Sequence, residues 1–120
     1  MAEYTEKQRI IQELVPGKQI TLAHIIANPD EILYKKLGLD PAVEYSKSAI
    51  GILTLSPAET AIIASDIAIK SSGAQLGFVD RFSGTVIITG TFSEVDASLR
   101  AVTQYAEETL GFSVCKITKT

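Results

Sequence analysis

Four stretches of the chain are rich in apolar and β-branched residues and are bounded by glycine, serine or proline, a pattern typical of β-strands. They are SAIGILTLS (48–56), AQLGFVDRF (74–82), GTVIITGTF (84–92) and FSVCKITKT (112–120). The second and third stretches are separated only by Phe82, Ser83 and Gly84, which predict a tight hairpin between two strands.

Three short segments predict helix starts, because each places a capping side chain three residues before an acid. They are NPDE (28–31), SPAE (56–59) and SEVD (93–96). In the first two, a proline at the first helical position loses no hydrogen bond. Each predicted helix then reaches a glycine where it is expected to end, at Gly38, Gly73 and Gly111.

The two longer helices differ in how their apolar residues are distributed. Over 94–109, helical spacing gathers one apolar face and predicts packing on a flat sheet; its residues are Val95, Leu99, Val102, Ala106 and Leu110. Over 57–72 the apolar set is wider than one stripe. On the polar side of that helix, Asp66 and Lys70 are spaced for a favourable i, i+4 ion pair.

From residue 48 onward the order is strand, helix, strand, strand, helix, strand. This order predicts an α+β domain of the ferredoxin-like split βαβ type, an antiparallel sheet with two helices on one face. Residues 18–47 add a strand in KQITLA, a short helix over 28–37 and a polar connector over 38–47. The length suits one domain, which we place at 18–120, preceded by a tail and strand over 1–17.

The leading stretch Arg9–Val15 is a further strand with no evident partner. Ile10, Gln12 and Leu14 share one of its faces, while Ile11, Glu13 and Val15 share the other. An ordinary sheet edge is one interpretation. The other is a barrel closed by one strand from each of several subunits, which removes the exposed edge and its aggregation hazard. Because repeated copies of Glu13 would repel one another inside such a barrel, we expect Gln12's face to line the lumen.

Composition and charge exclude several classes of function. The net charge is −3 and no Lys/Arg cluster occurs, so nucleic-acid binding is not expected. No apolar run reaches the ~20 residues of a membrane helix, and the opening MAEYTEKQR lacks a signal peptide's apolar core. The single cysteine, Cys115, suits a reducing cytoplasm. Only 21% of residues are charged, which hints that some surface is buried against partners.

Residues that could act in catalysis or bind a ligand are few and far apart in the sequence. The single histidine, His24, has no nearby acid or thiol in sequence and is interpreted as a hydrogen-bonded structural residue, and Cys115 as a small buried filler. Asp80 and Arg81 are neighbours on a strand and so point to opposite faces. We interpret them as salt-bridge residues beside the turn or between subunits, with a charged ring on a symmetry axis as the alternative. No nucleotide-binding or zinc motif occurs, so we expect no cofactor, no metal site and no enzyme.

Three long phrases together resemble one protein family. RIIQELVPGKQITLAHIIANP, SAIGILTLSPAETAIIASDIA and GFVDRFSGTVIITG are similar to the circularly permuted shell proteins of bacterial microcompartments, in particular the ethanolamine- and propanediol-utilisation subunits. The resemblance runs from about Arg9 to Thr120. It implies a shell-domain core over 48–118, preceded by the strand and helix (19–37) that end the unpermuted relatives.

The resemblance also implies an assembly and a few positions within it. A homohexameric tile is expected, with Ile10, Gln12 and Leu14 in a six-stranded parallel β-barrel that caps the pore. Phe82, Ser83 and Gly84 match the family's pore loop, and Lys70 matches its tile-edge lysine. Other shell proteins and encapsulated enzymes are the expected partners, in a cytoplasmic shell of an ethanolamine, propanediol or choline pathway.

A second hypothesis comes from the fold alone. A ferredoxin-like regulatory domain that binds a small metabolite at a subunit interface has the same split βαβ plan, and fold does not assign function. The leading strand discriminates the two, because a ligand-binding domain does not need it whereas a barrel-capped tile does.

Overall fold

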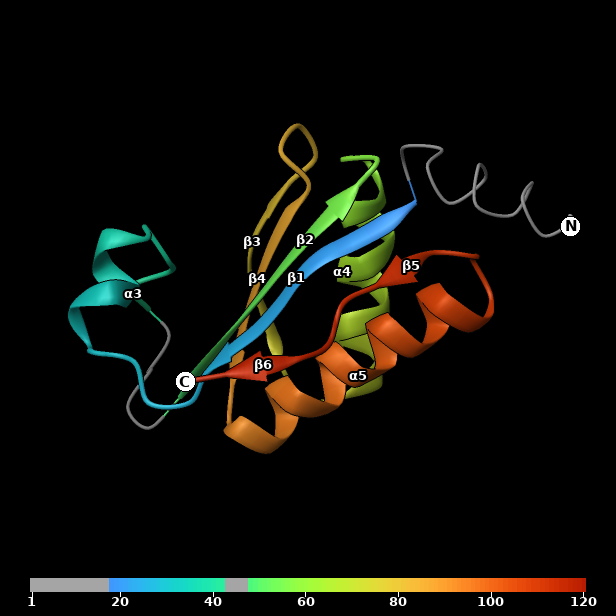
Figure 1. The fold of residues 1–120 in the computed structure, drawn as a ribbon. Helices are drawn as coiled ribbons and strands as arrows, with labels where there is room; N and C mark the ends of the chain where they lie inside the picture. Colours follow the sequence, from blue (N-terminus) through green and yellow to red (C-terminus); the bar gives the residue numbers. More distant parts are fainter. Residues whose placement is uncertain (1–17, 43–47) are drawn as a thin grey trace, which may run out of the picture.

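The computed structural model describes residues 18–42 and 48–120 (Figure 1). The predicted leading strand, with Ile10, Gln12 and Leu14, lies outside these residues. One sheet is built from six strands: β1 (Gln19–Ile26), β2 (Ala49–Ser56), β3 (Gln75–Asp80), β4 (Thr85–Gly90), β5 (Ser113–Val114) and β6 (Thr118–Lys119). The helices are α3 (Ile32–Lys36), α4 (Thr60–Ser71) and α5 (Phe92–Glu108).

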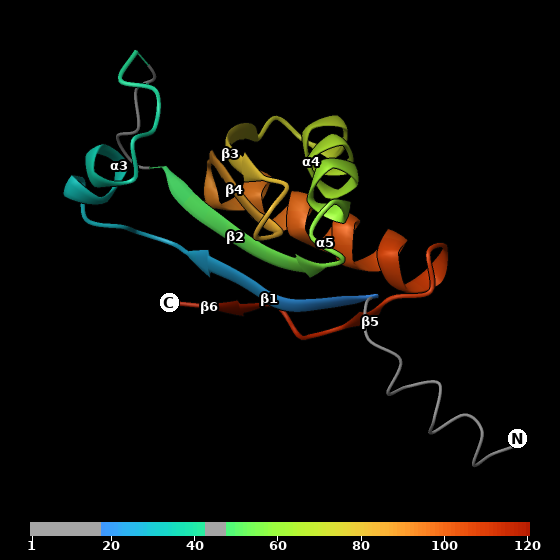
Figure 2. The ribbon, with the colours of Figure 1, turned by 90° about the horizontal axis from the view of Figure 1, so that it is seen from above.

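The strands are ordered β3-β4-β2-β1-β5, and β6 also pairs with β1. The pairs β3–β4, β4–β2 and β2–β1 are antiparallel, as predicted, whereas β5 and β6 run parallel to β1. Figure 2 shows α4 and α5 together on one side of the sheet, with α3 beyond the end where β1 finishes and β2 begins. The predicted α+β layering is therefore confirmed.

The last predicted strand, 112–120, is broken into two short pieces. Val114 pairs with Ile20 and Thr118 with His24, so the register on β1 is continuous, but residues 115–117 are not strand residues. The Cys115 N–H still donates to the carbonyl of Ile20 (3.1 Å). The break lies beside the segment in which β1 bulges against β2, between Ile20 and Leu22. Local bending at a bulge disrupts regular pairing. Cys115 consequently sits between strands rather than within one.

The predicted helix starts are wrong by two to four residues. Asn28 does not cap α3, which begins after Glu31, and Ser56 is still the last paired residue of β2, so α4 begins only after Glu59. At α5 the capping residue is Thr91 instead of Ser93: its hydroxyl accepts from the Glu94 N–H (3.1 Å), and the Glu94 carboxylate accepts from the Thr91 N–H (2.9 Å). Because β4 ends at Gly90, the helix begins directly after it, and Thr91 rather than Ser93 is the capping residue.

This capping box gives a direct test at α5. Thr91→Ala removes the hydroxyl acceptor and should lower the free energy of unfolding by about 1 kcal/mol. Ser93→Ala is the matched control, since Ser93 lies within the helix and is exposed; its effect should stay below about 0.5 kcal/mol. Urea denaturation of both variants measures the difference. Equal losses would contradict Thr91 as the cap.

The helix ends follow the predicted glycines in two cases of three. Gly38 and Gly111 have positive φ (73° and 75°), and the Phe112 N–H donates to the carbonyl of Ala106 (2.9 Å), as expected of a glycine-terminated helix. Gly73 does not terminate α4 in this way, because the helix already ends at Ser71 and Ser72 is extended. The hydroxyl of Ser72 instead donates to the carbonyl of Glu94 (3.0 Å) and ties the end of α4 to α5.

The main core lies between the sheet and the two long helices. On α5 the predicted face is confirmed: Val95, Leu99, Val102 and Ala106 are buried, and Leu110 packs against the cluster half-buried. The helix approaches β2 closely at Gly51, where an added Cβ would lie 2.6 Å from Val95 Cγ1. Such close approach fixes the distance between helix and sheet.

A smaller cluster covers the opposite face of the sheet at one end. Tyr34 of α3 and Leu39 pack against Ile50 and Ile87. The Tyr34 hydroxyl donates to the carbonyl of Ser48 (3.0 Å), so its polar end is also satisfied. The helix α3 is therefore attached to the sheet independently of α4 and α5.

Candidate assembly surface

Helix α4 buries its alanines and exposes three of its four isoleucines. It packs on the sheet and on α5 through Ala61, Ala64 and Ala68, which are buried. Three isoleucines are instead exposed: Ile62 (55%), Ile63 and Ile69. A surface helix normally places its bulky apolar residues toward the core. The inverted arrangement explains the unusually wide apolar set in the sequence and indicates a surface that is covered by another molecule.

Strand β3 continues this apolar surface. It is the terminal strand of the sheet, and Leu76, Phe78 and Val79 on it are all exposed. Leu76 and Val79 pair with Ile88 and Val86, which face the helices, whereas Phe78 pairs with Ile87 on the opposite face. We call Ile62, Ile69, Leu76, Phe78, Val79 and Phe82 the β3 edge surface. A long apolar edge strand is a template for contact with another chain.

The loop Arg81–Gly84 joins β3 to β4, as the sequence predicts. The Asp80 carboxylate accepts from the Phe82 N–H (2.9 Å) and the Ser83 hydroxyl (2.9 Å). Gly84 has φ 77°, and an added Cβ there would meet the carbonyl oxygen of Leu55. Only glycine suits this position, because it needs both a left-handed backbone and the absence of a side chain. The loop is therefore a fixed turn.

The Asp80 hydrogen bonds give a testable titration. The Phe82 N–H, the Ser83 hydroxyl and the Arg81 charge stabilise the carboxylate and lower its pKa below the ordinary value of about 3.9. A lowered pKa means that the carboxylate supports the folded loop above that value and loses this effect as pH falls through the folded pKa. An NMR titration should show this depressed midpoint, and Ser83→Ala should raise it; an unchanged midpoint in the variant would contradict the assignment.

Phe82 projects from the loop and is 81% exposed, with the Arg81 guanidinium 4.9 Å from the centre of its ring. Ile62, Val79, Asp80, Arg81 and Phe82 line an open hollow of about 270 Å³. Asp80 and Arg81, which were predicted to form salt bridges beside the turn or between subunits, take part in none of the ion pairs found in residues 18–42 and 48–120. The Asp80 carboxylate accepts hydrogen bonds within the turn instead. The structure thus brings the predicted loop residues next to the exposed isoleucine of α4, a contact that sequence analysis missed.

Lys70 lies in the last turn of α4, next to the exposed Ile69. Its ammonium group pairs with the Asp66 carboxylate at 2.9 Å, which confirms the predicted i, i+4 pair. Both side chains are mostly exposed, so the pair itself contributes little to stability. The ammonium group remains accessible to a neighbour.

His24 has the hydrogen-bonded surroundings expected of it, whereas Cys115 is not the fully buried strand residue that was predicted. The two ring nitrogens of His24 lie 2.6 Å and 3.0 Å from the hydroxyls of Thr118 and Thr120, which fastens the C-terminal segment to β1. Cys115 is half-buried against the main core. Within the described part of the chain, no group of three or more His, Cys, Asp or Glu side chains is placed so that it could hold a metal ion.

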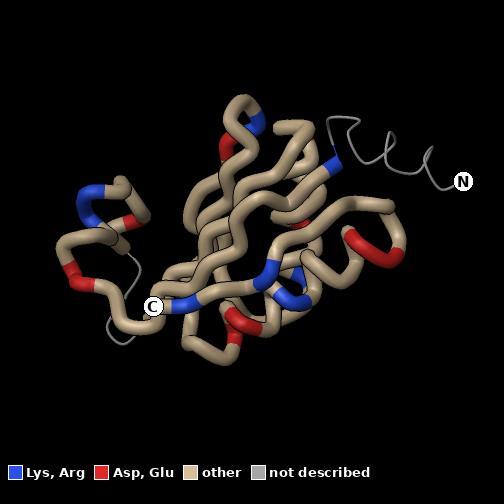
Figure 3. The backbone as a smooth tube through the Cα atoms, viewed as in Figure 1, with Lys and Arg blue, Asp and Glu red and all other residues tan. Residues whose placement is uncertain are grey.

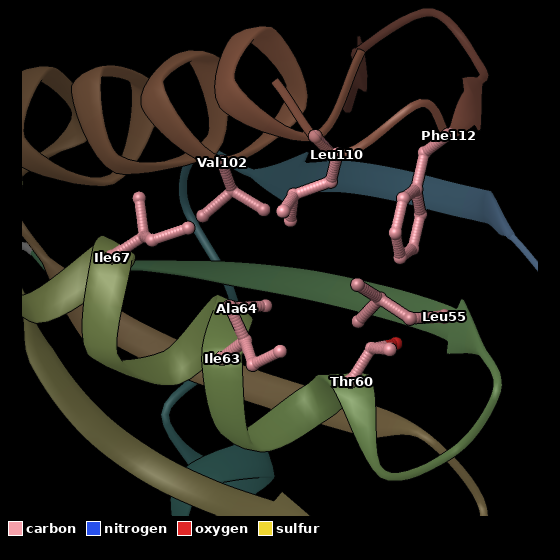
Figure 4. A pocket seen from close by; sticks show the side chains of 9 residues that line it. Leu55, Thr60, Ile63, Ala64, Ile67, Val102, Leu110 and Phe112 are labelled. Carbon is pink, nitrogen blue, oxygen red and sulfur yellow. The ribbon is translucent and has the colours of Figure 1, made fainter. Parts of the chain in front are cut away.

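A partly open apolar hollow between the helices and the sheet is very small. Figure 4 shows side chains from β2, α4 and α5 converging on it, among them Leu55, Ile63 and Val102. Its volume is about 10 Å³, roughly the space of one water molecule and far below the few hundred Å³ of a metabolite pocket. No helix in the described residues is long and apolar enough to cross a membrane.

The fold and the β3 edge surface together define a small α+β protein with an extensive apolar surface for contact with other chains. Residues 49–118 match the family model described as the BMC domain. The chain belongs to this family of bacterial microcompartment shell proteins. The match begins at β2, so β1 and α3 precede it in sequence although β1 lies inside the same sheet.

Known shell proteins are similar to nearly the whole chain. PduU of Salmonella typhimurium is 55% identical over 112 residues, 93% of each chain. EutS of Escherichia coli is 47% identical over 114 residues, 95% of this chain and 98% of its own. CutR of Streptococcus intermedius is 50% identical over 111 residues, 92% of this chain and 91% of its own. All three are named bacterial microcompartment shell proteins.

Solved structures show the same fold in assembled forms. A structure titled CutR flat hexamer has a TM-score of 0.80 and 49% identity, covering 93% of this chain and 99% of its own. One titled CutR Screw, with a 41.9 Å pitch, has a TM-score of 0.79 and 47% identity, covering 88% and 100%. At 20% identity and a TM-score of 0.64, a fused permuted hexameric shell protein shares the fold, over 73% of this chain and 46% of its own. None of these comparisons favours the regulatory alternative.

Proposed function

We propose that the chain is the subunit of a homohexameric shell tile, joined to its neighbours through the β3 edge surface. The inverted packing of α4 carries this proposal, because isolated subunits would leave Ile62 and Ile69 beside the exposed residues of β3 in contact with water. The hexamers named among its structural relatives support it.

The leading segment and the β3–β4 loop are assigned to the centre of this tile. Six copies of the strand that carries Ile10, Gln12 and Leu14 close a parallel β-barrel over the pore, which leaves no free strand edge. Phe82, Ser83 and Gly84 surround the pore below it. The rigidity of this loop supports the assignment, since a pore lining needs a defined shape.

Lys70 is assigned to the tile edge, where its accessible ammonium group contacts an adjacent tile. Other shell proteins are then the lateral partners of the hexamer, and encapsulated enzymes are partners on the barrel side. The exposure of the Lys70 side chain at the end of α4 supports this assignment.

The test of the hexamer is its mass in solution. Sedimentation velocity at micromolar concentration should show a species of six times 12.9 kDa, because burying an apolar surface on every subunit favours the closed ring. A monomer under these conditions would contradict the proposal.

A chain that begins at Lys18 is the control for the leading segment. It should keep the mass of six subunits, since the β3 edge surface is intact, while losing the barrel. If the shortened chain is monomeric, the contacts that hold the ring lie in residues 1–17 instead.

A further inference from the structure

A long groove runs between α5 and the C-terminal segment, on the side of the fold away from β3. One half has a volume of about 520 Å³ and is lined by residues that include Arg100, Gln104, Lys116 and Ile117. The other half, of about 190 Å³, shares Arg100 and Ile117 and extends to Phe92 and Lys119. The two halves therefore lie side by side along α5, and we call them together the groove.

The floor and walls of this groove differ in polarity. Val114 and Ile117 form an apolar floor and pack against the main core. The α5 wall presents Arg100, Gln104 and Glu107 at spacings of three and four residues, which places them on one side of the helix. Such a groove can hold apolar side chains on its floor and polar ones at its rim.

Positive charge gathers here although the chain as a whole carries −3. Arg100, Lys116 and Lys119 line the groove, and Figure 3 shows basic positions of α5 and of the C-terminal segment side by side. Two carboxylates also line it, Asp96 and Glu107. Asp96 accepts from Arg100 Nε at 2.9 Å, which leaves both terminal nitrogens of that guanidinium for a partner. The Lys119 ammonium group lies 5.3 Å from the centre of the Phe92 ring, and both lysine side chains are exposed.

The C-terminal strands add backbone groups to the groove. The sheet ends at β5, and β6 pairs only with β1 in the described part of the chain, so the outer edge of this segment has no strand beside it there. An extended peptide can pair with such an edge while its alternate side chains occupy two faces. An edge with cationic neighbours selects acidic side chains at alternate positions.

We propose that this groove binds an extended acidic peptide segment of a partner protein. Its apolar side chains contact Val114 and Ile117, and its carboxylates pair with Arg100, Lys116 and Lys119. The site lies on a different part of the fold from the β3 edge surface.

The single thiol of the chain reports on occupancy, because Cys115 lines the groove. The probe is a fluorescein-labelled ten-residue peptide in which Glu and Val alternate, and the control peptide has Lys in place of Glu. Fluorescence anisotropy measures binding to the full-length protein, and the rate of Cys115 modification by a thiol reagent measures protection. The acidic peptide should bind and slow the thiol reaction, and its affinity should fall with added salt. The basic peptide should neither bind nor slow the reaction.

Matched variants locate the binding site. Lys116→Gln with Lys119→Gln should weaken binding of the acidic peptide at least tenfold, the change that 1.4 kcal/mol produces. Lys35→Gln with Lys36→Gln removes the same charge from α3 and should leave the affinity unchanged. Both pairs are on the surface, so circular dichroism should show the same folded state.

Three results would overturn the proposal: equal binding of the two peptides, equal loss in the two double variants, or a thiol rate that bound acidic peptide does not change. Protection of Cys115 that rises with protein concentration alone would assign the groove to a second copy of the chain and also overturn it. Sedimentation of the same samples reports the hexamer separately, so failure of one proposal is distinguishable from failure of the other.

Discussion

Replacing Phe78 with aspartate is expected to give a folded subunit that no longer forms the hexamer. Phe78 is 44% exposed on the sheet's terminal strand, so the subunit alone tolerates a carboxylate there. In an assembled ring the same carboxylate would be buried against a neighbour without a partner, at a cost of several kcal/mol per contact. Because the cost recurs at every contact in the ring, sedimentation velocity should show a complete shift to monomer.

Tyr105→Asp is the matched control for this substitution. Tyr105 is also an exposed aromatic residue, at 45%, but it lies on α5 rather than on β3. This variant should keep the hexamer. A hexamer that survives Phe78→Asp, or one that Tyr105→Asp dissociates equally, would contradict the assignment of the interface to the β3 edge surface.

The burial pattern of α4 connects the assembly to the fold. Alanines at 61, 64 and 68 bring the helix close to the sheet, which moves the neighbouring isoleucines away from the core. In an isolated subunit, the same arrangement would leave these isoleucines exposed to water. It supports the proposal that other chains cover this helix.

Much of the architecture was predictable because its signals are local. Helical spacing on α5 identified every residue that the helix buries except Ser98, which is polar but donates its hydroxyl to the carbonyl of Ala68 (2.8 Å). The β3–β4 hairpin followed from Phe82, Ser83 and Gly84. Helix starts were less predictable. Ser56 is still paired in β2, and Thr91 rather than Ser93 caps α5. Both outcomes depend on where the preceding strand ends.

The candidate surface was only partly predictable from sequence. The wide apolar set of α4 was visible, but which isoleucines face outward depends on the alanines that contact the sheet. The neighbourhood of Ile62 and Phe82 depends on how the hairpin packs beside α4, a contact between residues twenty positions apart. Likewise, the groove beside α5 is lined in part by residues 115–117, which lie between β5 and β6. Such non-local features follow from packing rather than from spacing along the chain.

Leu99→Ala should produce the largest loss of subunit stability. Leu99 is fully buried at the centre of the α5 face, and shortening it removes apolar contacts and leaves a cavity between α5 and the sheet. The expected decrease in the free energy of unfolding is about 3 kcal/mol. Urea denaturation measures it best in the Phe78→Asp background at fixed concentration, since assembly raises apparent stability by mass action.

Leu37→Ala is the control for Leu99→Ala, because it truncates a leucine that is not buried. Leu37 is 43% exposed, so its truncation should cost less than about 1 kcal/mol. The urea midpoint should therefore fall much further for Leu99→Ala while its slope stays constant, because the surface exposed on unfolding is nearly unchanged. Similar midpoints for the two variants would mean that the packing of α5 on the sheet is not what stabilises the subunit.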